Sequence, residues 1–142
     1  MKRLSVILIG VILIMIANAL AEVSYRTAQI DDLDIFYREA GPKDGPTILL
    51  LHGLPSSSRM YQPLLESELA NQYHLVAPDY PGFGHSSWPD PKSFAYTFDH
   101  LAKIIEDFTE QLHFDRYTLF VRTTAVRLVF AWPWLTPKEF RR

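Results

Sequence analysis

Residues 48–55 read ILLLHGLP, and this stretch decides the fold. Its four leading apolar residues have the continuous pattern of a strand that is buried on both faces. Gly53 and Pro55 then favour a tight turn at the edge of a sheet. The residue types leave two readings open, a structural turn and a catalytic loop in which Leu54 offers an amide to a developing oxyanion. His52 is expected to order this loop through hydrogen bonds rather than to act as a base.

The flanking sequence alternates strand and helix patterns. Strands are predicted at 23–28 and 33–38, as an antiparallel hairpin, and then at 47–51, 73–77 and 117–121. Amphipathic helices are predicted from residue 56 to about 70 and over 93–112. This order is typical of an α/β fold in which a hairpin leads into parallel strands joined by crossover helices.

A second loop follows the 73–77 strand and reads DYPGFGHS at residues 79–86. Asp79 is expected to shape it by binding the backbone of its own turn. Gly82 and Gly84 permit a positive φ, which indicates a structural role for both. Residues 85–88 are candidates for the mouth of a pocket.

Composition excludes several classes of function. The chain has no cysteine, so it forms no disulfide and no thiolate metal site. Its net charge is −2 and no basic stripe is visible, which argues against a nucleic-acid partner. His74, His100 and His113 have no ligand partner at metal-binding spacing, so we expect no metal and no cofactor.

The N-terminus has the pattern of an export signal. Lys2 and Arg3 precede an apolar run, and small residues follow it at 17–21. The run is shorter than the ~20 residues of a spanning helix, which leaves an uncleaved membrane anchor as the alternative. We therefore expect residues 1–21 to be a signal peptide and the protein to be periplasmic or secreted. The membrane is expected as a partner only through an uncleaved N-terminus.

Residues 23–121 resemble the N-terminal half of α/β-hydrolase-fold enzymes, particularly the epoxide hydrolase and haloalkane dehalogenase branch. The resemblance is carried by HGLPSSS at 52–58, by the 79–86 loop and by YTLFV at 117–121. It implies an aspartate nucleophile directly after the last strand, in a context such as Q-D-Y-G-G-P, and an ester that water later cleaves. Dehalogenases of this branch usually carry asparagine where Leu54 stands. The implied ancestral substrate is therefore an epoxide or a related small apolar molecule.

The resemblance stops after Val121. Residues 122–127 read RTTAVR, so Thr123 occupies the nucleophile position without the glycines of a sharp elbow or a visible base. No catalytic residue is therefore intact. Residues 122–142 also hold five of the fourteen Lys and Arg residues but one of the sixteen Asp and Glu residues. This composition shift indicates an aberrant tail, distinct from a domain over 22–121.

A shift of reading frame would explain the tail. Residues 122–142 can be back-translated with codons that, read from one base earlier, encode QDYGGPVGFRLAMAHPERIQA, which is similar to the family's elbow and following helix. The synonymous codons were chosen to favour this result, so it is a hypothesis: a single-base deletion near codon 122 shifted the frame and truncated the enzyme. The alternative is a basic, aromatic segment for a membrane surface, although Pro133 and Pro137 interrupt any helix.

These expectations predict an incomplete and inactive hydrolase. The cap domain, the later acid and the catalytic histidine that the resemblance implies are not among the 142 residues. The strand at 117–121 would then form an open sheet edge that favours aggregation. The alternative from another class is a noncatalytic exported binding or interaction protein. That protein would unfold cooperatively in a thermal melt, whereas the incomplete hydrolase would fold poorly.

Overall fold

The computed structural model describes residues 22–122 and 125–127. The expected signal peptide, Thr123 and residues 128–142 of the expected aberrant tail lie outside the described residues. Within the described ranges, no helix is long and apolar enough to cross a membrane.

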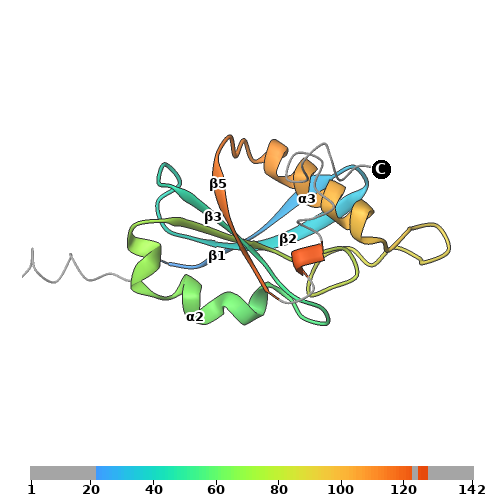
Figure 1. The fold of residues 1–142 in the computed structure, drawn as a ribbon, viewed down its shortest axis with the longest axis horizontal. Helices are drawn as coiled ribbons and strands as arrows, with labels where there is room; N and C mark the ends of the chain where they lie inside the picture. The colour runs from blue at the N-terminus through green and yellow to red at the C-terminus, as the bar shows by residue number, and fades with distance from the viewer. Residues whose placement is uncertain (1–21, 123–124, 128–142) are drawn as a thin grey trace, which may run out of the picture.

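A mixed sheet forms the centre of the described fold (Figure 1). Its strand order is β1-β2-β4-β3-β5. The first two strands form an antiparallel hairpin, β2 continues antiparallel to β4, and β4, β3 and β5 run parallel. This arrangement confirms the predicted hairpin leading into parallel strands. The bounds are Ser24–Ile30 for β1, Leu33–Ala40 for β2, Thr47–Leu51 for β3, His74–Pro78 for β4 and Tyr117–Val121 for β5.

The central strands bury side chains on both faces, as the apolar run at 48–51 predicts. Leu49 and Leu51 belong to a core cluster beneath helix α3 (Phe98–Gln111), in which Phe108 is fully buried. Leu50 belongs to a second cluster with Leu65 of helix α2 (Gln62–Leu65). The two helices lie on opposite faces of the sheet (Figure 1). Alternate residues of one strand thus face two separate cores, because successive side chains point to opposite sides.

The helix predicted from 56 to about 70 is wrong as one continuous helix. The segment forms a 3₁₀ turn η1 (Ser58–Tyr61), α2 and a second 3₁₀ turn η2 (Glu68–Asn71). Ser67 causes the break, because its hydroxyl donates to the Leu64 carbonyl and also accepts the Leu69 amide. A serine that bonds the local backbone in this way favours a cap over a helix interior.

The helix predicted over 93–112 begins later, at Phe98. Thr97 is the N-cap, with extended backbone and a hydroxyl that accepts the His100 amide at 3.2 Å. Phe94 lies in the preceding turn and still packs against the core beneath α3. The apolar pattern therefore begins before the helix does, because the capping residue Thr97 sets the first helical residue.

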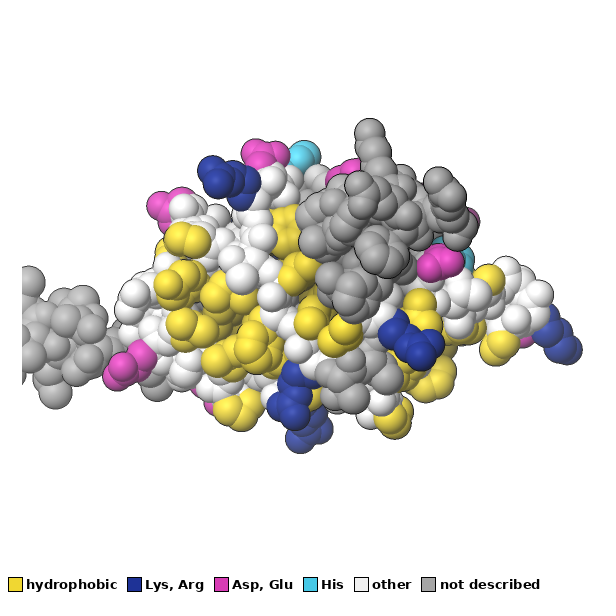
Figure 2. Space-filling model, viewed as in Figure 1, with side chains coloured by type: hydrophobic (Ala, Val, Ile, Leu, Met, Phe, Trp, Pro, Cys, Tyr) yellow, Lys and Arg dark blue, Asp and Glu magenta, His cyan; other side chains and the backbone are white. Residues whose placement is uncertain are grey.

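Strand β5 is the last strand of the sheet within the described residues. Phe120 on this strand is 48% exposed. Apolar side chains gather on the face between β5 and α2 (Figure 2). Among the residues described, the outer edge of β5 thus has no strand partner, as an incomplete sheet would leave it.

Candidate active site

His52 joins the two loops that follow β3 and β4. It is fully buried, its Nδ1 lies 2.9 Å from the Gly53 carbonyl oxygen, and its Nε2 accepts the Tyr80 amide at 3.3 Å. Burial lowers the pKa of His52, although the Gly53 carbonyl and Asp79 oppose this effect. The neutral ring with its proton on Nδ1 satisfies both contacts. This geometry suits a histidine that orders backbone.

Asp79 connects three segments around the same loops. Its side chain is fully buried; Oδ1 accepts the Ser58 amide at 2.5 Å and Oδ2 accepts the His85 amide at 2.9 Å. The φ values of Gly82 and Gly84 are 80° and 55°. A Cβ on Gly84 would lie 1.9 Å from Asp79 Oδ2, so the carboxyl group occupies the space that a side chain would need.

Ser86 and Ser87 are not among the residues that line the groove beside Trp88. Ser86 Oγ donates to the Asp79 carbonyl at 2.7 Å and accepts the Phe36 amide at 2.9 Å. Ser87 Oγ accepts the Asp34 amide, so both serines hold the loop against β2. Trp88 is 73% exposed and lines an apolar groove of about 550 Å³ between the two loops.

The end of β5 lies beside the His52 loop. Strands β3 and β5 are parallel with Leu51 opposite Val121, and the Arg122 amide donates to the Leu51 carbonyl at 3.3 Å. Residues 125–127 are helical, and Ala125 is fully buried in the core beneath α3. Strand β5 and the helical residues 125–127 therefore flank the position at which the resemblance implies a nucleophile. Thr123, which is expected at that position, lies outside the described residues.

Tyr61 and Tyr80 also belong to this end of the sheet, and no local sequence pattern indicates a role for either residue. Tyr61 donates its hydroxyl to the Leu51 carbonyl at 2.8 Å, and burial raises its pKa to about 12 against the opposing effect of Arg122. The ring centroid of Tyr80 lies 4.2 Å from that of His52. Neither contact is visible in a local pattern, because the partners are distant along the chain.

Two of the remaining predicted histidines contact other groups of the protein. In the part of the chain that the structure describes, no group of three or more His, Cys, Asp or Glu side chains has the arrangement of a metal site. His100 Nδ1 instead lies 2.9 Å from the Ala95 carbonyl oxygen, and His74 pairs with Glu39.

Comparison with known proteins agrees with this geometry. A sequence model of the alpha/beta hydrolase fold family matches residues 46–121. An uncharacterized hydrolase of Saccharomyces cerevisiae is 40% identical over 91 residues, which make up 64% of this chain and 30% of that protein. A haloalkane dehalogenase of Mycobacterium marinum is 37% identical over 90 residues, which make up 63% of this chain and 30% of that protein.

Solved structures give the same picture. The loop variant DbeA-M1 of a Bradyrhizobium elkanii haloalkane dehalogenase superposes with a TM-score of 0.68 at 30% identity, over 78% of this chain and 35% of that one. Cfl2 from Burkholderia cenocepacia superposes with a TM-score of 0.71 at 26% identity, over 80% of this chain and 37% of that one. The chain thus spans about a third of the length of the proteins it matches.

Proposed function

The chain belongs to the α/β hydrolase fold family, and we propose that it derives from a hydrolase of the dehalogenase and epoxide hydrolase-like branch that forms an aspartyl-ester intermediate. The proposed substrate is an epoxide or a related small apolar molecule. The chain as it stands is proposed to be inactive. The matched segments cover 30% of the length of these relatives.

The observation that carries the proposal is the position of Arg122 beside Leu51. Their backbone contact puts the residue after β5 next to the loop of His52, Gly53, Leu54 and Pro55. A nucleophile at that point would attack a substrate carbon, and the resulting ester would hold its carbonyl near the loop. The Leu54 amide would then stabilise the oxyanion that forms when water attacks the ester.

Leu54 also supports the choice of substrate class. Its side chain has no hydrogen-bond donor for a leaving halide, whereas opening of an epoxide ring releases no separate anion. The groove lined by Trp88 and Phe83 is apolar, which suits a small apolar substrate. We therefore favour an epoxide over a haloalkane, although relatives named haloalkane dehalogenases are among the matches.

Inactivity follows from residues 122–127, which offer no carboxylate at the nucleophile position. The proposed cause is the single-base deletion near codon 122. Sequencing the gene and its downstream DNA tests this cause: a family-like continuation in the other frame is expected, and its absence would refute the frameshift.

The functional test compares two proteins in an assay of epoxide and ester hydrolysis. The chain as it stands is expected to match a buffer blank, and the product of the frame-restored gene is expected to turn substrate over. A restored protein with asparagine in place of its new aspartate is the matched control and is expected to be inactive. Turnover by the unrestored chain would overturn the proposal of inactivity.

Export is a separate proposal that rests on the composition of residues 1–21. Expression of the full gene should yield a protein in the periplasm or medium that begins near residue 22. N-terminal sequencing of the exported protein checks this, and retention of residues 1–21 in the membrane fraction would favour an uncleaved anchor.

A further inference from the structure

An open groove lies between the loop that follows β3 and the loop that follows β4. Its volume is about 550 Å³, which falls within the range of about 300–1,000 Å³ that is typical of small-molecule sites. Side chains of both loops and of the 3₁₀ turn η1 form its wall. They include Pro55, Arg59, Met60, Phe83 and Trp88.

The wall of this groove offers apolar surface that solvent can reach. Trp88 is 73% exposed, and Phe83 and Met60 are half-buried. Exposed apolar surface of this kind gains free energy when a ligand removes it from water, and aromatic rings also pack favourably against other rings. An apolar ring or chain therefore fits the groove.

Arg59 is the one charged side chain among the described residues that line the groove. It is exposed, and its guanidinium has no ion pair or hydrogen-bond partner in the described part of the chain. Asp79 lies behind the wall, but it is fully buried and its two oxygens accept the amides of Ser58 and His85. The groove thus presents one positive charge, without a paired carboxylate, beside an apolar surface.

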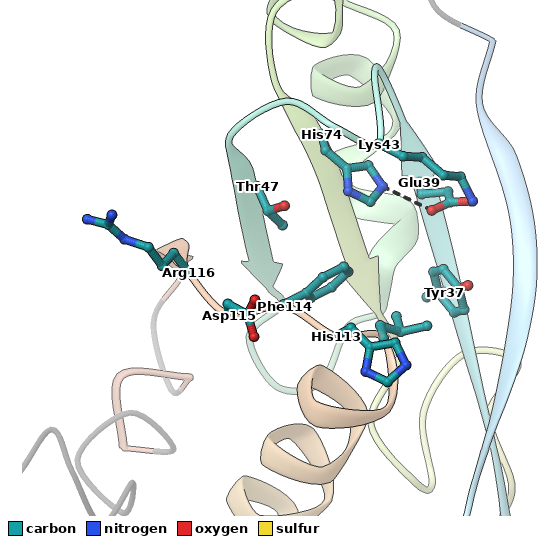
Figure 3. A pocket seen from close by; sticks show the side chains of 10 residues that line it. Tyr37, Glu39, Lys43, Thr47, His74, His113, Phe114, Asp115 and Arg116 are labelled. Atoms are coloured by element: carbon teal, nitrogen blue, oxygen red, sulfur yellow. Dashed lines mark hydrogen bonds and ion pairs between the residues drawn. The ribbon is translucent and has the colours of Figure 1, made fainter.

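A second cavity, of about 360 Å³, lies at the opposite end of the sheet and differs in its charges (Figure 3). Glu39 in its wall pairs with Arg26 and with Lys43, the latter at 2.9 Å. Oε2 of Glu39 also lies 3.0 Å from His74 Nε2. Burial raises the pKa of Glu39, but the hydrogen bonds from Lys43, His74 and Arg26 outweigh burial and hold this pKa below its usual range. Positive and negative groups are therefore already paired in that wall, whereas Arg59 is not.

From this contrast we propose that the groove between the two loops binds an apolar organic acid. Its ring or chain packs on Trp88 and Phe83, and its carboxylate faces Arg59, whose planar guanidinium matches a carboxylate in shape and charge. A cationic ligand would be repelled by Arg59, and a neutral one would gain nothing from it. The inference rests on the proposed function in sharing its groove, and it narrows the proposed substrate to an apolar molecule that carries an acidic group.

The test measures binding to the full chain at neutral pH by equilibrium dialysis. The probe 2-naphthoate is compared with 2-naphthamide, which has the same ring but no charge, and with acetate, which has the charge but no ring. The naphthoate is expected to bind saturably and about three- to fivefold more tightly than the amide, with a preference that sodium chloride reduces, and acetate is expected not to bind measurably. Equal affinities of naphthoate and amide, or no saturable binding of naphthoate, would overturn the proposal.

Three variants locate the effect. Arg59→Gln should remove the preference for naphthoate over naphthamide. Arg116→Gln is the matched control and should keep it, because Arg116 is exposed and lines the cavity at the opposite end of the sheet. Trp88→Ala should weaken the binding of both compounds by more than about fivefold, since it removes an aromatic contact surface. A preference that persists in Arg59→Gln would overturn the assigned role of Arg59.

The comparison of the three compounds needs no variant, so it decides the proposal even where a variant fails to fold. It also needs no turnover, which separates it from the proposed function. Absence of naphthoate binding would refute the acid-binding groove and leave the hydrolysis assay of the frame-restored protein to be judged by itself. Naphthoate binding without turnover by the restored protein would refute the proposed function and retain the groove.

Discussion

Replacing Asp79 tests how the two loops are held together. In Asp79→Ala the amides of Ser58 and His85 lose the carboxyl oxygens that accept them at 2.5 and 2.9 Å. A hydrogen bond to a carboxylate contributes about 1.5–3 kcal/mol. Water replaces the partner of His85, which is exposed, but not readily that of Ser58, which is fully buried. We therefore expect the free energy of unfolding to fall by about 3–4 kcal/mol.

Asp79→Asn should cost less, about 2–3 kcal/mol, because one amide oxygen remains to accept while the new NH₂ group opposes the other donor. The matched control is Asp32→Ala, which alters an exposed turn residue and should change stability by less than about 0.5 kcal/mol. Urea unfolding followed by tryptophan fluorescence measures the change in the free energy of unfolding for all three variants, provided that its dependence on urea concentration is the same in each. A loss below about 1 kcal/mol in Asp79→Ala would refute the assigned role.

Further substitutions probe the loop, the buried ion pair and the core. Gly84→Ala should lower the free energy of unfolding by at least about 2 kcal/mol, because the new Cβ would lie 1.9 Å from the Asp79 carboxyl group. Gly82→Ala should lower it by about 1 kcal/mol, because its Cβ would meet a movable aromatic ring at 2.7 Å. Equal urea midpoints for the two variants would contradict this order. The pKa of Glu39 is lowered in the folded protein, so its contribution to stability is complete above the unfolded-state pKa near 4.3 and is lost as the pH falls through the folded-state pKa. Glu39→Gln should lower the free energy of unfolding at neutral pH by about 1–3 kcal/mol and reduce the loss of stability on acidification. An unchanged loss of stability on acidification would argue against the assigned ion pairs of Glu39. Phe108→Ala should cost about 3–5 kcal/mol in calorimetric or urea unfolding, and a cost near zero would mean that the core beneath α3 is not packed as described.

The strands were the most predictable elements. The bounds of β3 and β5 agree with the predicted ranges 47–51 and 117–121. Both are short apolar runs bounded by turn or polar residues, so the local pattern contains the information. The helices were less predictable, because their ends depend on hydrogen bonds between a side chain and the backbone. Ser67 and Thr97 make such bonds and act as caps, which the pattern of apolar residues does not reveal.

The sequence predicted the two loops of the candidate site, but it did not predict which residues contact one another there. The sequence placed His52 and Asp79 in two loops that each follow a predicted strand, and the structure brings the two loops together. It did not indicate Ser58 as a partner of Asp79, 21 residues away, or Tyr80 as a partner of His52, 28 residues away. Such partners depend on which strands are neighbours, and strand order is a property of the whole sheet.

By itself, the sequence determined the family, through HGLP at 52–55 and the loop at 79–86, and it showed that residues 122–127, directly after the last strand, contain no carboxylate. These features are determined by residues adjacent in the chain. Only the tertiary structure decided that His52 holds two loops and that Glu39 and His74 form a buried pair. The physical reason is the antiparallel pairing of β2 with β4, which brings together two polar side chains 35 residues apart and buries them within hydrogen-bond distance of each other.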